Sequence, residues 1–112
     1  MNLLFVCSKN KLRSPTGEKI FSQYKGIQAI GCGTNADAAT PVSGDLIEWA
    51  DIIFPMEKKH QNKISKKYSH LIRDKKIICL AIPDNYKRME PALIHLLKNK
   101  VFNHLPLPIK SQ

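Results

Sequence analysis

Four short runs of apolar residues recur along the chain, and each is followed by polar or turn-forming residues. The runs contain no charged side chain and are rich in branched and aromatic residues; they cover residues 3–6, 27–30, 52–54 and 77–82. Continuous apolar runs of this length are typical of strands buried on both faces. The segments between them have helical spacing, and this alternation predicts an α/β fold, a four-stranded parallel sheet flanked by helices on both faces.

The first two helices have recognisable start signals. Ser14 is expected to cap the first helix, Pro15 suits its first turn, and Gly26 is expected to end it. A second helix is expected near residues 43–50, with Ser43 as its cap.

The later helices are predicted from their apolar stripes. The third begins near Glu57 and keeps its lysines outside. Its buried stripe is expected to be Ile64, Tyr68 and Leu71. The fourth begins at Pro91, and its stripe is Leu93, Leu96, Leu97 and Val101. The tail beyond it is predicted to be non-helical because it contains Pro106 and Pro108.

The length of 112 residues predicts a single domain spanning residues 1–112. No stretch approaches the roughly 18 to 20 consecutive apolar residues of a membrane span, so no membrane partner is expected. The first residues lack the charged region of a secretory signal, and we therefore expect a cytoplasmic protein. Three cysteines, at Cys7, Cys32 and Cys79, make no disulfide framework and have no zinc spacing, so no metal is expected.

Positive charge dominates the chain, with a formal net charge of +9. It is concentrated in the segment from Glu57 to Lys76, which carries eight basic and two acidic residues. Such a segment could attract nucleic acid or another phosphate-rich partner. We favour a solvated helix face, because lysine runs usually face water.

The loop that follows the first strand carries the chemistry. Cys7 ends the strand and Arg13 follows after a five-residue loop, at the edge of a parallel sheet where ligands bind. The loop residues Ser8, Lys9, Asn10, Lys11 and Leu12 can turn their backbone N–H groups inward and, with the N-terminus of the next helix, form an oxyanion cradle. The cradle, Arg13 and the Ser14 hydroxyl favour the thiolate form of Cys7, a nucleophile beneath a bound phosphate or other tetrahedral oxyanion. The planar guanidinium of Arg13 can hold two oxygens of that group.

The segment from Val6 to Pro15 resembles the signature of the low-molecular-weight protein tyrosine phosphatase family: a hydrophobic strand, Cys, five residues, Arg, Ser and usually Pro. The chain is similar to the short bacterial members of that family. Residues 31–34 and 54–62 resemble two further family segments. The resemblance implies a four-stranded parallel sheet, a cysteinyl-phosphate intermediate, and neither a metal nor an organic cofactor.

The resemblance also implies individual roles. Cys7 would be the nucleophile, Arg13 the phosphate clamp, Asn10 a loop-shaping residue and Ser14 the hydroxyl that stabilises the thiolate. This chain departs from the family pattern at Lys9, usually glycine, and at Leu12, usually a second cysteine.

Asp84 is the candidate general acid, because a phosphate monoester needs a proton on its departing oxygen. It stands in a loop after the fourth apolar run, in the order Pro83-Asp84, which reverses the Asp-Pro order of the family. The alternative is a simple turn residue. Tyr86 is expected either to line the pocket or to be an ordinary half-buried tyrosine.

These features predict a cysteine-dependent phosphomonoesterase, with phosphotyrosine in a protein or a small aryl phosphate as its substrate. One alternative is an arsenate reductase-like enzyme, which would need further cysteines as a relay. Another is a non-catalytic module that binds phosphate groups or nucleic acid; the lack of aromatic residues among the lysines argues against single-strand stacking. Cys32 and Cys79 are expected to be structural, and the four histidines, His60, His70, His95 and His104, to lie at the surface or partly buried.

Overall fold

The computed structural model describes residues 1–105, so the tail containing Pro106 and Pro108 lies outside the described residues. The strands are β1 (Asn2–Cys7), β2 (Gln28–Gly33), β3 (Ile52–Pro55) and β4 (Lys76–Ile77). The helices are α1 (Arg13–Phe21), α2 (Gly44–Trp49), α3 (Lys58–Lys67) and α4 (Pro91–Phe102). Among these helices none is both long and apolar enough to cross a membrane.

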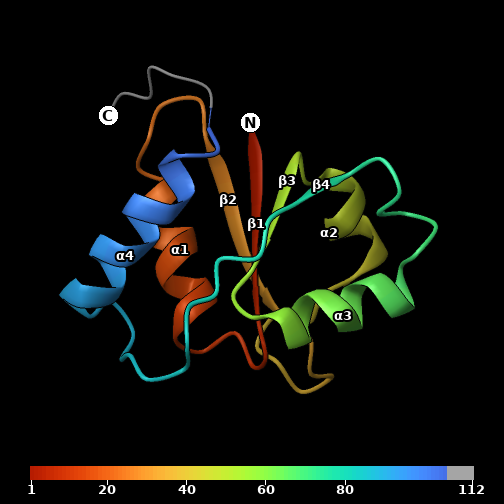
Figure 1. Ribbon diagram of the computed structural model, residues 1–112, viewed down its shortest axis with the longest axis horizontal. Helices are drawn as coiled ribbons and strands as arrows, with labels where there is room; N and C mark the ends of the chain where they lie inside the picture. The colour runs from red at the N-terminus through yellow and green to blue at the C-terminus, as the bar shows by residue number, and fades with distance from the viewer. Residues whose placement is uncertain (106–112) are drawn as a thin grey trace.

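The four strands form one parallel sheet in the order β2-β1-β3-β4 (Figure 1). The central strand β1 pairs with β2 from Asn2 opposite Gln28 to Cys7 opposite Gly33, and with β3 through Leu3 opposite Ile52. All carboxyl ends of the strands therefore meet at one edge of the sheet. The predicted fold class is confirmed.

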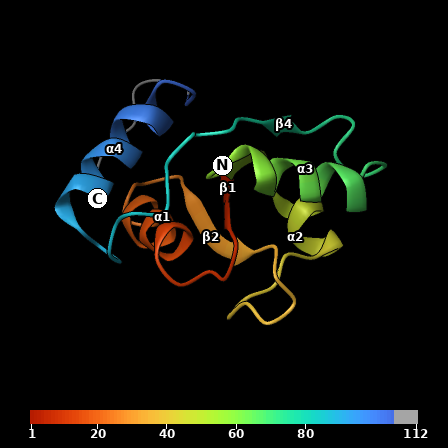
Figure 2. The same cartoon turned by 60° about the horizontal axis from the view of Figure 1, so that its bottom comes forward.

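Helices cover both faces of the sheet, α1 and α4 on one side and α2 and α3 on the other (Figure 2). Side chains of β1 alternate between the two resulting cores. Leu3, Phe5 and Cys7 belong to the core beneath α1 and α4, whereas Leu4 and Val6 belong to the core beneath α2 and α3. This alternation places the Cys7 side chain on the α1 face, next to the loop that leads into that helix.

The fourth apolar run forms much less regular strand than the predicted residues 77–82. Only Lys76 and Ile77 pair as β4, although the chain beyond them still follows β3, with Ile78 donating to Ile53 and Leu80 to Pro55, each over 2.9 Å. Ala81 has a left-handed φ of 54°, which interrupts the strand geometry. The chain therefore leaves the sheet toward the site as an irregular segment.

The helix boundaries agree in part with the sequence. Ser43 caps α2 by accepting from the Leu46 N–H over 3.2 Å, as predicted. In contrast, α1 ends at Phe21, earlier than predicted, and Gly26, with a φ of 84°, turns the chain into β2 instead. The helix α3 ends at Lys67, yet Tyr68 and Leu71 beyond its end still pack with the buried Ile64. The predicted apolar stripe of α4 contains three fully buried residues.

The open edge of β2 is covered by polar groups from other parts of the chain. The Glu18 carboxylate accepts from the Gly31 N–H over 2.7 Å, and the Ser22 hydroxyl donates to the carbonyl of Ala29 over 3.3 Å. Gly33 exchanges two backbone hydrogen bonds with the segment 40–42. The backbone of this edge strand is thus largely satisfied within the chain.

Candidate active site

The loop of residues 8–12 turns its carbonyl groups outward. The Ser8 carbonyl accepts from the Asn35 N–H over 2.9 Å, and the Lys9 carbonyl accepts from the Ala39 N–H over 3.3 Å. None of the N–H groups from Ser8 to Leu12 donates to another group within residues 1–105. Asn10 has a left-handed φ of 57°, which helps the loop to curl. The free donors and the N-terminus of α1 form a cradle that suits an anion.

Two glycines of β2 allow the loop to lie close to the sheet. A Cβ atom on Gly33 would lie 2.4 Å from the Ser8 carbonyl oxygen, and one on Gly31 would lie 2.6 Å from the Ser14 carbonyl oxygen. Both distances are far too short for non-bonded atoms, so the glycines in this segment are required by close approach.

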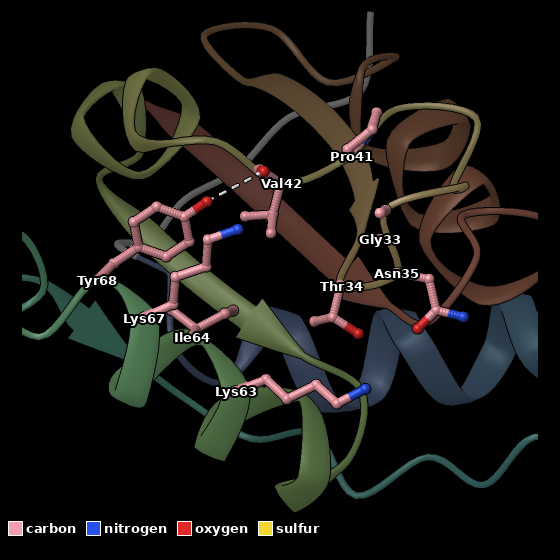
Figure 3. A pocket seen from close by; sticks show the side chains of 10 residues that line it. Gly33, Thr34, Asn35, Pro41, Val42, Lys63, Ile64, Lys67 and Tyr68 are labelled. Atoms are coloured by element: carbon pink, nitrogen blue, oxygen red, sulfur yellow. Dashed lines mark hydrogen bonds between the residues drawn. The ribbon is translucent and has the colours of Figure 1, made fainter.

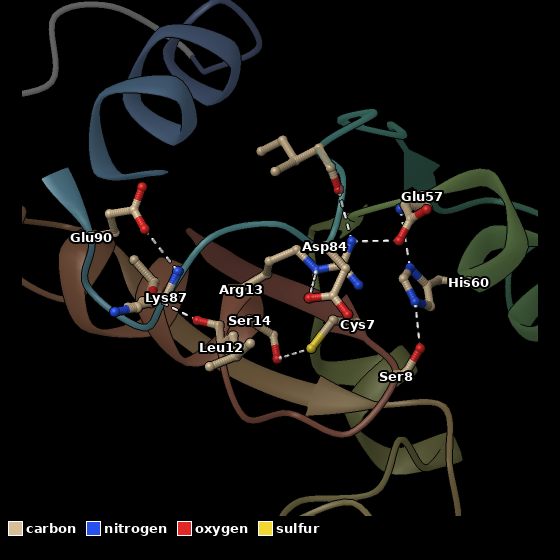
Figure 4. A network of polar contacts seen from close by, with 12 residues as sticks. Cys7, Ser8, Leu12, Arg13, Ser14, Glu57, His60, Asp84, Lys87 and Glu90 are labelled. Carbon is tan, nitrogen blue, oxygen red and sulfur yellow. Dashed lines mark hydrogen bonds and ion pairs between the residues drawn. The ribbon is translucent and has the colours of Figure 1, made fainter. Parts of the chain in front are cut away.

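A short chain of hydrogen bonds runs behind the loop. The Cys7 thiol lies 2.9 Å from the Ser14 hydroxyl (Figure 4). Ser14 donates to the Asn10 side-chain oxygen over 2.6 Å. The prediction that Ser14 caps the helix is wrong: α1 begins at Arg13, and no side chain caps it. The Ser14 hydroxyl faces Cys7 instead, because the loop folds back over the start of the helix.

Arg13 is buried, with 2% of its side chain exposed, and its guanidinium is held on one side. Its Nη1 atom donates to the Glu57 carboxylate over 2.5 Å and to the carbonyl of Ile82 over 2.7 Å. The hydrogen bond from Arg13 is the main cause that lowers the pKa of Glu57, so Glu57 remains a carboxylate. With Nη1 occupied, Nε and Nη2 are left to hold an oxyanion.

Asp84 lies at the other side of the same guanidinium. Its carboxylate oxygen is 3.7 Å from the Arg13 Nε, and 58% of the Asp84 side chain is exposed (Figure 4). Both residues line a cavity of about 200 Å³, whose full lining is Cys7, Ser8, Lys9, Lys11, Leu12, Arg13 and Asp84. The irregular segment after β4 thus brings an acid to the cradle although it lies 77 residues after Cys7 in the chain.

The remaining predicted site residues lie outside this lining. The side chains of Asn10 and Ser14 lie behind the loop; Ser14 contacts the Cys7 thiol, and Asn10 accepts from Ser14. Tyr86 is partly buried against the core beneath α1 and α4 and does not line the cavity. Within residues 1–105, no three His, Cys, Asp or Glu side chains gather in a group that could hold a metal ion.

His60 is a site residue that sequence reasoning missed. It was expected at the surface or partly buried, yet it is fully buried at the start of α3. Its Nδ1 accepts from the Glu57 N–H over 3.1 Å, and its Nε2 lies 2.9 Å from the Ser8 hydroxyl. A neutral imidazole that accepts at Nδ1 carries its proton on Nε2, so His60 donates to Ser8. The Ser8 hydroxyl proton is then free to point into the cavity.

Acid is expected to destabilise the fold through His60. Burial, reinforced by the charge of Arg13, lowers the pKa of His60 from 6.5 to about 4. The unfolded chain therefore binds one more proton between these values, and this contribution to stability, complete above pH 6.5, is lost as the pH falls toward 4. The slope within the interval is roughly 1.4 kcal/mol per pH unit at most. Urea unfolding at several pH values measures it.

The matched comparison for this pH dependence uses His60→Asn and His70→Asn, since His70 is exposed. We expect the His60 variant to be less stable at pH 7 and to lose much of the slope between pH 6.5 and 4. The His70 variant should keep the wild-type slope. Identical slopes in all three proteins would exclude His60 as the titrating group.

The other two cysteines are unpaired, like Cys7. Cys32 is fully buried in the core beneath α2 and α3, on the face of the sheet opposite to Cys7. Burial, with a smaller contribution from Cys7, raises the pKa of the Cys32 thiol, so it stays protonated. Cys32 is thus an inert thiol within the core.

Comparison with known proteins gives structural matches only. No protein-family model and no curated protein sequence matches the chain. A low-molecular-weight protein tyrosine phosphatase from Streptococcus pyogenes is similar in structure, with a TM-score of 0.75 and 13% identity, over 94% of this chain and 93% of that one. The tyrosine phosphatase Wzb from Escherichia coli K30, solved in complex with phosphate, is also similar, with a TM-score of 0.70 and 20% identity, over 91% of this chain and 94% of that one.

A third solved structure is YwlE arginine phosphatase from Geobacillus stearothermophilus, with a TM-score of 0.66 and 17% identity, over 96% of this chain and 99% of that one. At such low identity the matches show the fold. The chain thus has the fold of the low-molecular-weight protein tyrosine phosphatases, as the resemblance implied.

Proposed function

We propose that this protein is a cysteine-dependent phosphomonoesterase that acts on phosphotyrosine or similar aryl phosphates. The observation that carries the proposal is the convergence of three side chains on one small cavity: a buried thiol, Cys7, an anchored guanidinium, Arg13, and an exposed carboxylate, Asp84. The solved proteins of this fold include tyrosine phosphatases and an arginine phosphatase, which adds support for phosphoryl chemistry.

In the first step, the Cys7 thiolate attacks the phosphorus atom and forms an S–P bond while the P–O bond to the leaving group breaks. Asp84, in its protonated form, gives its proton to the departing oxygen. The N–H groups of residues 8–12 and the free edge of Arg13 bind the three remaining oxygens, where charge spreads in the transition state. The products are a cysteinyl phosphate and the neutral alcohol or phenol.

In the second step, water attacks the same phosphorus atom as the S–P bond breaks. The Asp84 carboxylate takes a proton from that water, inorganic phosphate is released, and the Cys7 thiolate is restored. The Ser14 hydroxyl, 2.9 Å from the sulfur, can turn its one proton from the Asn10 oxygen to the thiolate each time the thiolate forms. The cycle needs no other reactant than water.

The arsenate reductase alternative fits the site less well. Such a reaction would need a second thiol that can reach the sulfur of Cys7. Cys32, on the neighbouring strand, lies on the opposite face of the sheet, and a disulfide between them would need the strands to move.

The test is hydrolysis of nitrophenyl phosphate by the purified protein. We expect turnover that orthovanadate inhibits, and we expect phosphotyrosine to be hydrolysed faster than phosphoarginine. No turnover of any of these substrates, with phosphate still bound, would contradict the enzyme and favour a binding module.

Asp84→Asn tests the acid. The variant should lose on the order of 10² to 10⁴ in kcat for a phenyl phosphate with a poor leaving group, because the departing oxygen is no longer protonated. The loss should be smaller for nitrophenyl phosphate, whose leaving group needs less help. Asn85→Asp in the wild-type background is a control that keeps Asp84. Equal losses on both substrates, or none, would make Asp84 a turn residue.

A further inference from the structure

Lysines from two separate elements gather around the mouth of the cradle. Lys9 and Lys11 are exposed and line the cavity that contains Cys7. Lys59, on α3, has its Nζ atom 3.9 Å from the Glu57 carboxylate that holds Arg13. Lys63 follows one turn later, and the charges of Lys59 and Lys63 both help to lower the pKa of His60. We call Lys9, Lys11, Lys59 and Lys63 the rim lysines.

A second cavity continues this basic surface along α3. It measures about 100 Å³ and is lined by the end of β2, the segment 41–42 and one face of α3, with Lys63 and Lys67 among its residues (Figure 3). It adjoins the cradle, because Thr34 in its wall donates its N–H to the carbonyl of Cys7 over 2.9 Å. Among residues 1–105, no acidic side chain lines this second cavity.

The positive charge of the rim is left largely uncompensated by the protein. Within residues 1–105, the carboxylates that form ion pairs with a residue of the cradle are Glu57 and Asp84, and both pair with Arg13. Lys59 shares Glu57 with Arg13, and neither Lys9, Lys11 nor Lys63 has an ion-pair partner in that part of the chain. The mouth therefore carries an excess of positive charge that attracts anions beyond the phosphoryl group itself.

The size of the cavity decides where the rest of a substrate lies. About 200 Å³ is below the range of pockets that enclose a drug-sized ligand, so it accommodates a phosphoryl group and little more. The remainder of the substrate must cross the rim, where the lysines stand.

We propose that the protein prefers phosphotyrosine within an acidic polypeptide segment, with the rim lysines contacting flanking Asp and Glu side chains. The inference rests on the proposed function and adds the substrate class. An acidic peptide fits better than single-stranded nucleic acid, because no aromatic side chain among residues 1–105 lines the cradle itself, and Tyr86 packs against the core. Tyr68 lines the second cavity, but its hydroxyl donates to the Val42 carbonyl and its ring packs against the core beneath α2 and α3.

The experiment compares three phosphotyrosine peptides of equal length whose flanking residues are acidic, neutral or basic. At low salt, we expect kcat/KM to fall in that order. The acidic peptide should exceed the basic one by roughly 2-fold to several hundredfold, because two to four exposed charge contacts each contribute about 1.4- to 5-fold. The ratio should approach one near 1 M salt, where the screening length is about 3 Å.

Lysine-to-glutamine variants show which lysines cause the preference for the acidic peptide. Lys59→Gln/Lys63→Gln should reduce the acidic-to-basic ratio by roughly 2- to 25-fold. The charge-matched control is Lys25→Gln/Lys76→Gln. Both control lysines are exposed near the amino ends of the strands, opposite to the cradle, and that variant should keep the ratio. An equal rate on all three peptides at low salt, or the same loss in both variants, would overturn the inference.

Two further measurements separate this inference from the proposed function. Turnover of nitrophenyl phosphate tests the enzyme alone, whatever the peptides show. Direct binding of the three peptides to the Cys7→Ser protein tests the preference even if turnover is absent, and equal affinities would overturn it. Tighter binding of a 5′-phosphorylated oligonucleotide than of the acidic peptide would also overturn it, in favour of nucleic acid.

Discussion

Cys7→Ser is expected to lose the ability to turn over aryl phosphates, by a factor on the order of 10⁵ or more, as when the nucleophile is removed from other covalent enzymes. A serine hydroxyl is a far weaker nucleophile than a thiolate at neutral pH. Phosphate or tungstate binding should survive, because the cradle is formed by the N–H groups of residues 8–12 and by Arg13. Steady-state kinetics and calorimetric titration with tungstate measure the two effects.

The matched control is Cys79→Ser, which changes a thiol that does not line the cavity. It should keep wild-type kinetics. Measurable turnover in a pure Cys7→Ser preparation would exclude Cys7 as the nucleophile. Loss of tungstate binding together with turnover would mean that the substitution had disturbed the loop.

Arg13→Lys should have the second largest effect, a loss of kcat on the order of 10² to 10³. A lysine keeps the charge and can still reach Glu57, but its point-like ammonium cannot bond Glu57, the Ile82 carbonyl and two phosphoryl oxygens at once. Because those oxygens gain charge in the transition state, the loss should fall mainly on kcat and less on KM. Steady-state kinetics with nitrophenyl phosphate measure how the loss divides between kcat and KM.

Arg88→Lys is the control for this substitution, because Arg88 is exposed and does not line the cavity. It should leave both constants unchanged. Thermal unfolding of the two variants shows whether Arg13→Lys still folds, and a folded Arg13→Lys protein with wild-type kcat would exclude Arg13 as the clamp.

Much of the fold could be predicted from the sequence because its signals are local. The runs at residues 3–6 and 52–54 form strands since they are apolar throughout, and Ser43 caps a helix by a contact three residues away. The loop after Cys7 was predictable for the same reason, since the spacing of Cys7 and Arg13 sets its length. The short β4 was not, because no residue in the apolar run marks the loss of strand pairing after Ile77 or the left-handed turn at Ala81.

The residues that hold the site residues in place, Glu57 and His60, do so through contacts between distant parts of the chain, which local sequence patterns do not reveal. Glu57 reaches Arg13 across 44 positions, and His60 reaches Ser8 across 52. In the sequence both stand at the start of a lysine-rich helix, where a surface position is the ordinary expectation. A signal did exist: Glu57 and His60 follow directly after a strand, at the sheet edge where Cys7 also lies.

The covered edge of β2 also has a consequence for self-association. An exposed strand edge is a template on which a second chain can add its own strand, and this is a common route to aggregation. Here Glu18, Ser22 and the segment 40–42 already occupy much of the hydrogen-bonding capacity of one edge. The other edge offers the two residues of β4, beginning with the exposed Lys76, followed by an irregular segment that still bonds β3. We therefore expect concentrated solutions of the protein to resist growth by strand addition, even though the sheet itself is rich in apolar residues.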